Sequence, residues 1–117
     1  MTKNLDSEGL RSVFDNYELF FIDLWGVVHN GIELHENAVH ALSKISEAKK
    51  NYILLTNAPR PNKIVKNFLE KLSLDRRMRD KVFTSGEAAL GYLKKNYINQ
   101  KFYHIGPPRD FNLFIDF

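Results

Sequence analysis

The stretch from Phe20 to Gly31, FFIDLWGVVHNG, constrains the fold of this chain most strongly. The apolar run over residues 19–22 is typical of a strand buried on both faces, and Asp23 stands where that strand should end. His29-Asn30-Gly31 follows, and Asn-Gly is a strong turn signal because both residues tolerate positive φ. The stretch therefore predicts a buried strand, a carboxylate at its carboxyl end and then a small hairpin.

The rest of the chain alternates between helical and strand-like patterns. Amphipathic spacing predicts helices over residues 36–50 and 63–74, and the capping-box pair Thr84 and Glu87 predicts a third that runs to about residue 97. Short apolar runs predict further strands near residues 52–56 and 101–105. We therefore expect a three-layer α/β core with a parallel sheet, in which the first strand lies between the other two or beside the second.

Composition narrows the class of protein. The chain has 117 residues, enough for one domain over 1–117, and carries a net charge of only +3 and no cysteine. No apolar run approaches the roughly 18 residues that span a bilayer, and the N-terminus has no signal-peptide core. We therefore expect a cytoplasmic protein with no membrane partner and no nucleic-acid partner.

Two polar segments allow local predictions. Ser7 is a candidate cap for a short helix with Leu10, Val13 and Phe14 on its apolar face. The segment DRRMRDK, residues 75–81, could bind an anion or RNA, but its interspersed acids favour a solvated connection.

Polar residues that follow the first two predicted strands are candidates for chemistry. Asp23 ends one strand and Thr56-Asn57 ends the next, and the carboxyl ends of parallel strands meet at one sheet edge. A carboxylate can attack phosphorus or bind Mg²⁺, and a hydroxyl can hold a phosphate oxygen. The alternatives are structural: Asp23 as a strand-end cap or paired acid, and Thr56 as a turn cap. A receiver-like domain is disfavoured, because Asp15 is too isolated to supply the paired acids.

The motifs FFIDLWGVVHNG and YILLTNAPR, with the later TSGEAA and KFYHIGPPRD, resemble the haloacid dehalogenase (HAD) superfamily of hydrolases. The likeness is strongest to subclass IIA, the NagD-like phosphatases, and covers about residues 17–113. It implies part of a Rossmann-like core without the cap domain and the C-terminal strands. It also implies that Asp23 is a nucleophile forming an aspartyl-phosphate and that Thr56 and Asn57 bind the phosphoryl group. Mg²⁺ would be held by Asp23 and the main-chain carbonyl of Trp25, and residues 26–34 would form the squiggle and flap.

The chain also departs from that family pattern. Trp25 occupies the position of the usual general acid, and an indole cannot exchange a proton near pH 7. His29 is a candidate replacement, although a lone loop histidine is usually exposed. The family's later lysine and acidic motif have no counterpart here. We therefore expect a Mg²⁺-dependent phosphatase of a small phosphorylated metabolite, truncated and weakly active alone; the alternative is a remnant without turnover. An exposed first strand would also favour self-association.

Overall fold

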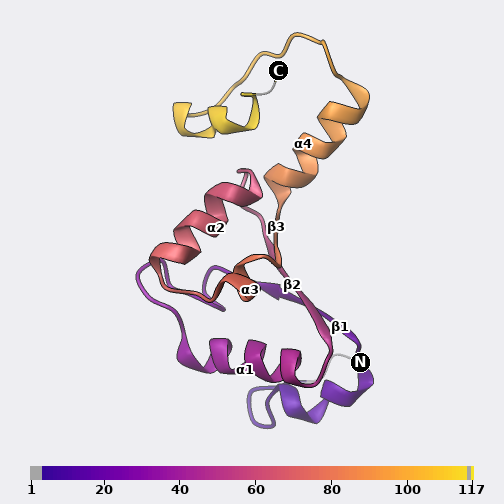
Figure 1. Ribbon diagram of the computed structural model, residues 1–117, viewed down its shortest axis with the longest axis vertical. Coiled ribbons are helices and arrows are strands. Elements are labelled where there is room, and N and C mark those ends of the chain that lie inside the picture. The colour runs from indigo at the N-terminus through magenta and orange to yellow at the C-terminus, as the bar shows by residue number, and fades with distance from the viewer. Residues whose placement is uncertain (1–3, 116) are drawn as a thin grey trace.

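A three-stranded parallel sheet forms the centre of the computed structural model, which describes residues 4–115 and 117 (Figure 1). Its strands are β1 (Leu19–Asp23), β2 (Asn51–Thr56) and β3 (Val82–Thr84), in the order β1-β2-β3. The pairs Asp23↔Leu55 and Thr56↔Thr84 set the register at the carboxyl ends of the strands. The predicted parallel α/β fold is confirmed, and β1 lies beside β2 as expected.

Two helices cover one side of this sheet. In Figure 1, α1 (Glu36–Glu47) and α2 (Asn62–Lys71) lie on the same side of the strands. Both begin near the predicted positions and end a few residues earlier, because Lys49 and Ser73 adopt φ values of 59° and 67° that leave the helical conformation. The other helices are α3 (Arg76–Arg79), α4 (Ser85–Asn96) and the 3-10 helices η1 (Leu10–Ser12), η2 (Phe14–Asn16) and η3 (Pro108–Leu113).

The core lies between the sheet and this helical layer. Its buried apolar side chains are Leu24, Val28, Leu42, Ile45, Tyr52, Leu54, Leu69, Leu74 and Val82. Leu42 and Ile45 lie on the apolar stripe of α1, and Leu69 lies on that of α2. Helical periodicity therefore located the buried faces of both helices.

The predicted buried character of the first strand is wrong. Residues along β1 alternate between exposed and partly buried, and Phe21 is 66% exposed. Leu55 of β2 and Phe83 of β3 are also exposed, at 43% and 42%. Of the three expected layers, the described residues supply the sheet and one helical layer. The opposite face of the sheet presents apolar side chains to solvent, and β1 is an edge strand.

The third strand lies elsewhere than predicted. The segment 101–105 forms no strand, whereas Val82–Thr84 pairs with the end of β2. Tyr103 and Ile105 are 91% and 90% exposed. These residues follow α4, which leads away from the sheet, so their alternating pattern has no strand to pair with (Figure 1). The described chain accordingly has a radius of gyration of 16.7 Å, against about 13 Å for a compact domain of this length.

Two local predictions have opposite outcomes. The short N-terminal helix is not capped by Ser7: η1 begins after Gly9, with no side-chain cap. The hairpin is confirmed: the Asn30 side chain accepts the N–H groups of Ile32 and Glu33, both at 2.9 Å. Gly31 has the positive φ, 90°, that the turn signal predicts. Among the helices of the described residues, none has the length and apolar character needed to cross a bilayer.

Candidate active site

The two strand ends that carry the predicted site residues are neighbours. Asp23 ends β1 opposite Leu55, and Thr56 lies one residue further toward the carboxyl end of β2. Asp23, Thr56 and Asn57 line one cavity of about 520 Å³. The remaining lining residues are Phe21, Leu55, Phe83, Thr84, Ser85 and Ala88. The structure therefore brings together the nucleophile candidate and both phosphate-binding candidates, with apolar side chains of the open sheet face on one side of them.

Asp23 is exposed, and its carboxylate is partly engaged by the backbone. The Oδ1 atom accepts the N–H of Leu24 at 2.8 Å. The chain then turns tightly, because the Leu24 carbonyl accepts the N–H groups of residues 27–29 at 2.8–3.2 Å. Leu24 itself is buried, so its side chain anchors this turn to the core while Asp23 faces the cavity.

Trp25 and His29 pack against each other inside this turn. Their rings make an edge contact with centroids 5.3 Å apart, and His29 contacts Phe68 of α2 in a similar way. Trp25 is 65% exposed and lies over Gly31, where an added Cβ would overlap the indole ring. The positive φ favours glycine at position 31, whereas the overlapping indole atoms belong to the outer end of an exposed side chain that can shift. The Trp25 side chain has a packing role, and only its main-chain carbonyl remains available as a metal ligand.

His29 is buried, at 4% exposed, so the expectation that a lone loop histidine would be exposed is wrong. Its Nδ1 accepts the N–H of Gly31 at 3.0 Å, so Nδ1 carries no proton in this arrangement. Burial lowers the pKa of His29, His35 lowers it further, and Asp23 partly opposes the shift. His29 is consequently neutral near pH 7, which disfavours it as the missing general acid.

Thr56 and Asn57 lead into a loop whose backbone orients the threonine. The Thr56 Oγ1 accepts the N–H of Ala58 at 3.3 Å. The hydroxyl hydrogen can then point elsewhere, toward a bound anion. Asn57 is exposed, follows directly and lines the same cavity.

Oxygen ligands for a cation are few in this part of the chain. Among the described residues there is no group of three or more histidine, cysteine, aspartate or glutamate side chains that could hold a metal ion. The Asp23 carboxylate and the Trp25 carbonyl are the hard oxygen donors that Mg²⁺ prefers. They fit Mg²⁺ chemically, but two donors form only part of its usual octahedral shell.

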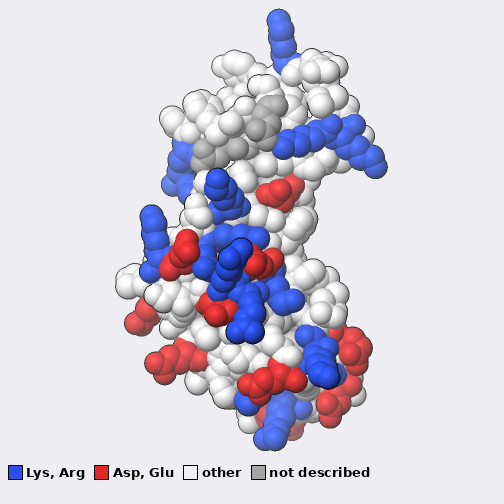
Figure 2. Space-filling model, viewed as in Figure 1, with Lys and Arg blue, Asp and Glu red and all other residues white. Residues whose placement is uncertain are grey.

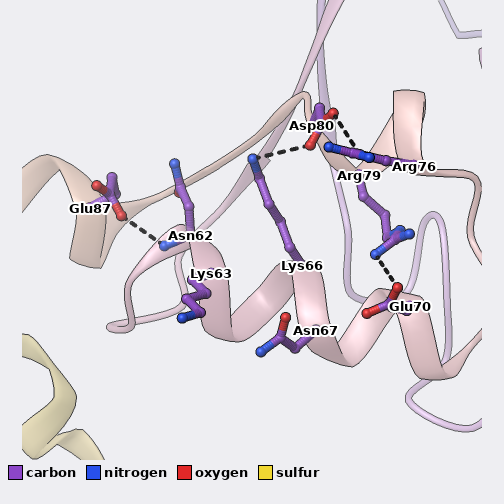
Figure 3. Close-up of a pocket in the computed structure, with 9 residues that line it drawn as sticks. All are labelled: Asn62, Lys63, Lys66, Asn67, Glu70, Arg76, Arg79, Asp80 and Glu87. Atoms are coloured by element: carbon purple, nitrogen blue, oxygen red, sulfur yellow. Dashed lines mark hydrogen bonds and ion pairs between the residues drawn. The ribbon is translucent and has the colours of Figure 1, made fainter.

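A second depression lies between α2, α3 and the start of α4 and has a volume of about 550 Å³. Positive and negative side chains intermingle over this region of the surface (Figure 2). Lys66 and Arg76 approach Asp80 at 3.5 and 3.9 Å, and Arg79 approaches Glu70 at 3.2 Å (Figure 3). These cations already face carboxylates. The depression therefore supports the prediction of a solvated connection over residues 75–81 and not that of an anion or RNA site.

One set of residues near the cavity escaped sequence analysis. Thr84 caps α4 as predicted, with its Oγ1 accepting the Glu87 N–H at 2.9 Å. The same junction also bonds the loop over residues 58–62, which the capping pattern did not indicate. No local sequence signal reports these contacts, since the partners lie 22–27 residues apart.

Comparison with known proteins identifies relatives that are similar in sequence and fold. A family model described as haloacid dehalogenase-like hydrolase matches residues 20–115. A crystal structure of a haloacid dehalogenase-like hydrolase from Brucella suis 1330 is 31% identical with a TM-score of 0.78, covering 92% of this chain and 39% of that one. Phosphoglycolate phosphatase 2 of Arabidopsis thaliana is 31% identical over an alignment of 107 residues, and the match covers 87% of this chain and 35% of that protein.

Two further solved structures extend the comparison. The 4-nitrophenylphosphatase of Thermotoga maritima is 26% identical with a TM-score of 0.62, covering 73% of this chain and 33% of that one. A protein assigned as NagD has a TM-score of 0.70 at 24% identity, which supports the fold alone. The chain thus spans well under half the length of the relatives that it matches.

Proposed function

This chain belongs to the haloacid dehalogenase-like hydrolases, and we propose that its site transfers a phosphoryl group from a small phosphorylated metabolite to Asp23. The observation that carries the proposal is the cavity shared by Asp23, Thr56 and Asn57 at the ends of two adjacent parallel strands. Two relatives with 26% and 31% identity are named as phosphatases, which supports the same class of reaction.

The proposed reaction has two steps at one carboxylate. Because Oδ1 of Asp23 accepts the Leu24 N–H, we assign Oδ2 as the attacking oxygen. It forms a bond to phosphorus while the bond between phosphorus and the leaving oxygen breaks, which gives an aspartyl-phosphate. Water then attacks this phosphorus and loses a proton to solvent while the bond between Asp23 Oδ2 and phosphorus breaks, which releases orthophosphate and regenerates the Asp23 carboxylate.

Thr56 and Asn57 supply the binding part of the site. The Thr56 hydroxyl, oriented through the Ala58 N–H, donates a hydrogen bond to one phosphoryl oxygen. Asn57 adds amide donors from the same strand end, so the phosphorus is held in line with Asp23. These groups position the substrate but carry no positive charge.

Mg²⁺ would be held by the Asp23 carboxylate and the Trp25 carbonyl. When bound, it supplies the charge neutralisation that phosphoryl transfer requires. Because two ligands hold Mg²⁺ only weakly, we propose that residues 1–117 alone are a poor catalyst. The lack of a group of three or more ligating side chains among the described residues also favours the alternative, a site without turnover.

The leaving group must depart without help from a side-chain acid at position 25. The indole of Trp25 has no acidic proton, and His29 is neutral with an unprotonated Nδ1. Phosphates of acidic alcohols, such as aryl phosphates, should therefore react faster than alkyl phosphates. Losing one preorganised stabilising group typically lowers a rate by about 10²–10³.

Hydrolysis of 4-nitrophenyl phosphate with Mg²⁺ tests the proposal. We expect slow turnover that disappears in Asp23→Asn and persists in Asp15→Asn, which changes an exposed carboxylate on η2 that does not line the cavity. Equal turnover in the chain and in Asp23→Asn would contradict the assignment of the nucleophile. Fast, Asp23-dependent turnover by a monomer would instead contradict the expected weakness of the isolated chain.

A further inference from the structure

The junction between β3 and α4 contacts the loop that follows Thr56-Asn57. We propose that this junction, residues 84–87, is a clamp that positions the phosphate-binding loop, residues 57–62. The inference rests on the proposed function for its meaning in catalysis, but the clamp itself is defined by contacts. Thr84 and Ser85 border the cavity, but their hydroxyl groups donate to the loop, so they act as positioning residues.

The first half of the clamp holds the loop directly after Asn57. The carbonyl of Ala58 accepts two hydrogen bonds, from Ser85 Oγ at 3.0 Å and from the Gly86 N–H at 3.1 Å. The N–H of Ala58 meanwhile bonds Thr56 Oγ1. The residue that orients the Thr56 hydroxyl is thus itself fixed from the opposite side by α4.

The second half holds the end of the loop. The buried Thr84 hydroxyl donates to the Arg60 carbonyl, and the Thr84 N–H donates to Asn62 Oδ1 at 2.9 Å. Glu87 Oε2 accepts the Asn62 N–H at 2.8 Å (Figure 3). In an isolated capping box the glutamate would reach back to the Thr84 N–H. Here Asn62 takes both positions, so the cap of α4 is completed by the loop.

Gly86 shows how closely the two segments approach. A Cβ placed on Gly86 would overlap the backbone N, C and O atoms of Arg60, which cannot move aside as a flexible side chain could. Gly91, five residues later in the same helix, has no atom within 4 Å of such a Cβ. The requirement for glycine at 86 therefore comes from the loop, and Gly91 provides a matched control.

Hydrogen exchange tests the clamp without any ligand. We compare the amides of the loop with those of β2, which report global opening. Thr84→Val should accelerate exchange of the Asn62 amide relative to β2 by about tenfold, equivalent to about 1.4 kcal/mol. Thr84→Ser should restore protection because it keeps the hydroxyl. Unchanged relative protection in Thr84→Val would overturn the clamp.

The glycine pair and a phosphate titration extend the test. Gly86→Ala should accelerate amide exchange in the loop relative to β2, while Gly91→Ala leaves it unchanged; equal behaviour of the two would also overturn the clamp.

Orthophosphate with Mg²⁺ is then titrated while the amide resonances of Thr56 and Asn57 are followed. We expect Thr84→Val to weaken binding about tenfold and Thr84→Ser to retain it. Absence of binding to the unmodified chain would count against the proposed function, whereas the exchange data would still decide the clamp.

Discussion

Asp23 and His29 lie in the same turn and have different surroundings. Asp23 is exposed at the cavity, and His29 is enclosed by Trp25 and Phe68. Enclosure disfavours the imidazolium because the charged ring would lose its hydration. The turn therefore keeps one carboxyl group exposed at the cavity and one histidine neutral inside the structure.

The lowered pKa of His29 predicts a pH dependence of stability. In the unfolded chain His29 titrates near 6.5, whereas the folded protein resists protonation, so below 6.5 the unfolded state binds more protons. The stabilisation that comes from keeping His29 neutral is therefore fully present above pH 6.5. It is lost as the pH falls toward the lower pKa of His29 in the folded protein. Urea unfolding between pH 7 and 5 should show this loss. The free energy of unfolding should depend less steeply on pH in His29→Asn than in the unmodified chain. In His40→Asn, at an exposed position on α1, the slope should be unchanged.

Equal slopes for the unmodified chain and His29→Asn would contradict this account of the buried histidine.

The sequence located Asp23 and Thr56 because strand ends are readable from apolar runs. It did not predict the burial of His29, because that burial depends on Trp25 and on Phe68 of a distant helix. The tertiary partners of a loop are not contained in its local pattern.

At the scale of elements, Lys50 joins the N-terminal segment to the beginning of β2. Its Nζ donates to the carbonyls of Phe14 and Tyr17 at 2.8 and 2.7 Å, and it lies 4.7 Å from the centroid of the Phe14 ring. The side chain is only 12% exposed. These contacts satisfy carbonyl groups at both ends of η2 and hold η2 against the beginning of β2.

We expect Lys50→Met to lower the free energy of unfolding by about 1–3 kcal/mol, because it leaves those carbonyls without their charged donor. Lys44→Met is the control: Lys44 pairs with Glu47 at 2.7 Å, but both side chains are more than half exposed. Such surface pairs contribute about 0–1 kcal/mol. Urea titration measures both changes, and a loss from Lys50→Met no larger than that from Lys44→Met would refute the anchoring role.

The third strand shows why element prediction failed at one place. Val82-Phe83 is too short to be recognised by alternation, and its assignment depends on pairing with β2. Residues 101–105 have a better strand pattern but no partner in the described sheet. Strand formation requires a neighbour to satisfy backbone hydrogen bonds, so pattern alone could not decide between the two segments.

At the scale of the molecule, the described chain differs most from a domain with a fully covered sheet at the sheet face that stays open to solvent. Phe21, Leu55 and Phe83 expose apolar surface beside the unpaired edge of β1. Edge strands with exposed apolar residues pair readily with other chains. We propose that a second copy of this chain covers the β1 edge and the adjoining face.

Sedimentation velocity over a range of concentrations measures this association. We expect the chain to form dimers or larger species as concentration rises, and Phe21→Lys to shift it toward monomer by placing a charge on the open face. Ile32→Lys is the control, since Ile32 is 83% exposed in the hairpin and lies outside the sheet. A chain that stays monomeric throughout the range would refute self-association.

The central claim is that Asp23 accepts a phosphoryl group, and trapping the aspartyl-phosphate tests it most directly. Incubation with an aryl phosphate and Mg²⁺, followed by borohydride, reduces an acyl phosphate to homoserine, which peptide mass spectrometry locates. A single turnover suffices, so weak catalysis does not obscure the result. We predict homoserine at position 23 and unmodified aspartate at exposed positions such as Asp15. No conversion at position 23, or equal conversion at Asp15, would contradict the account.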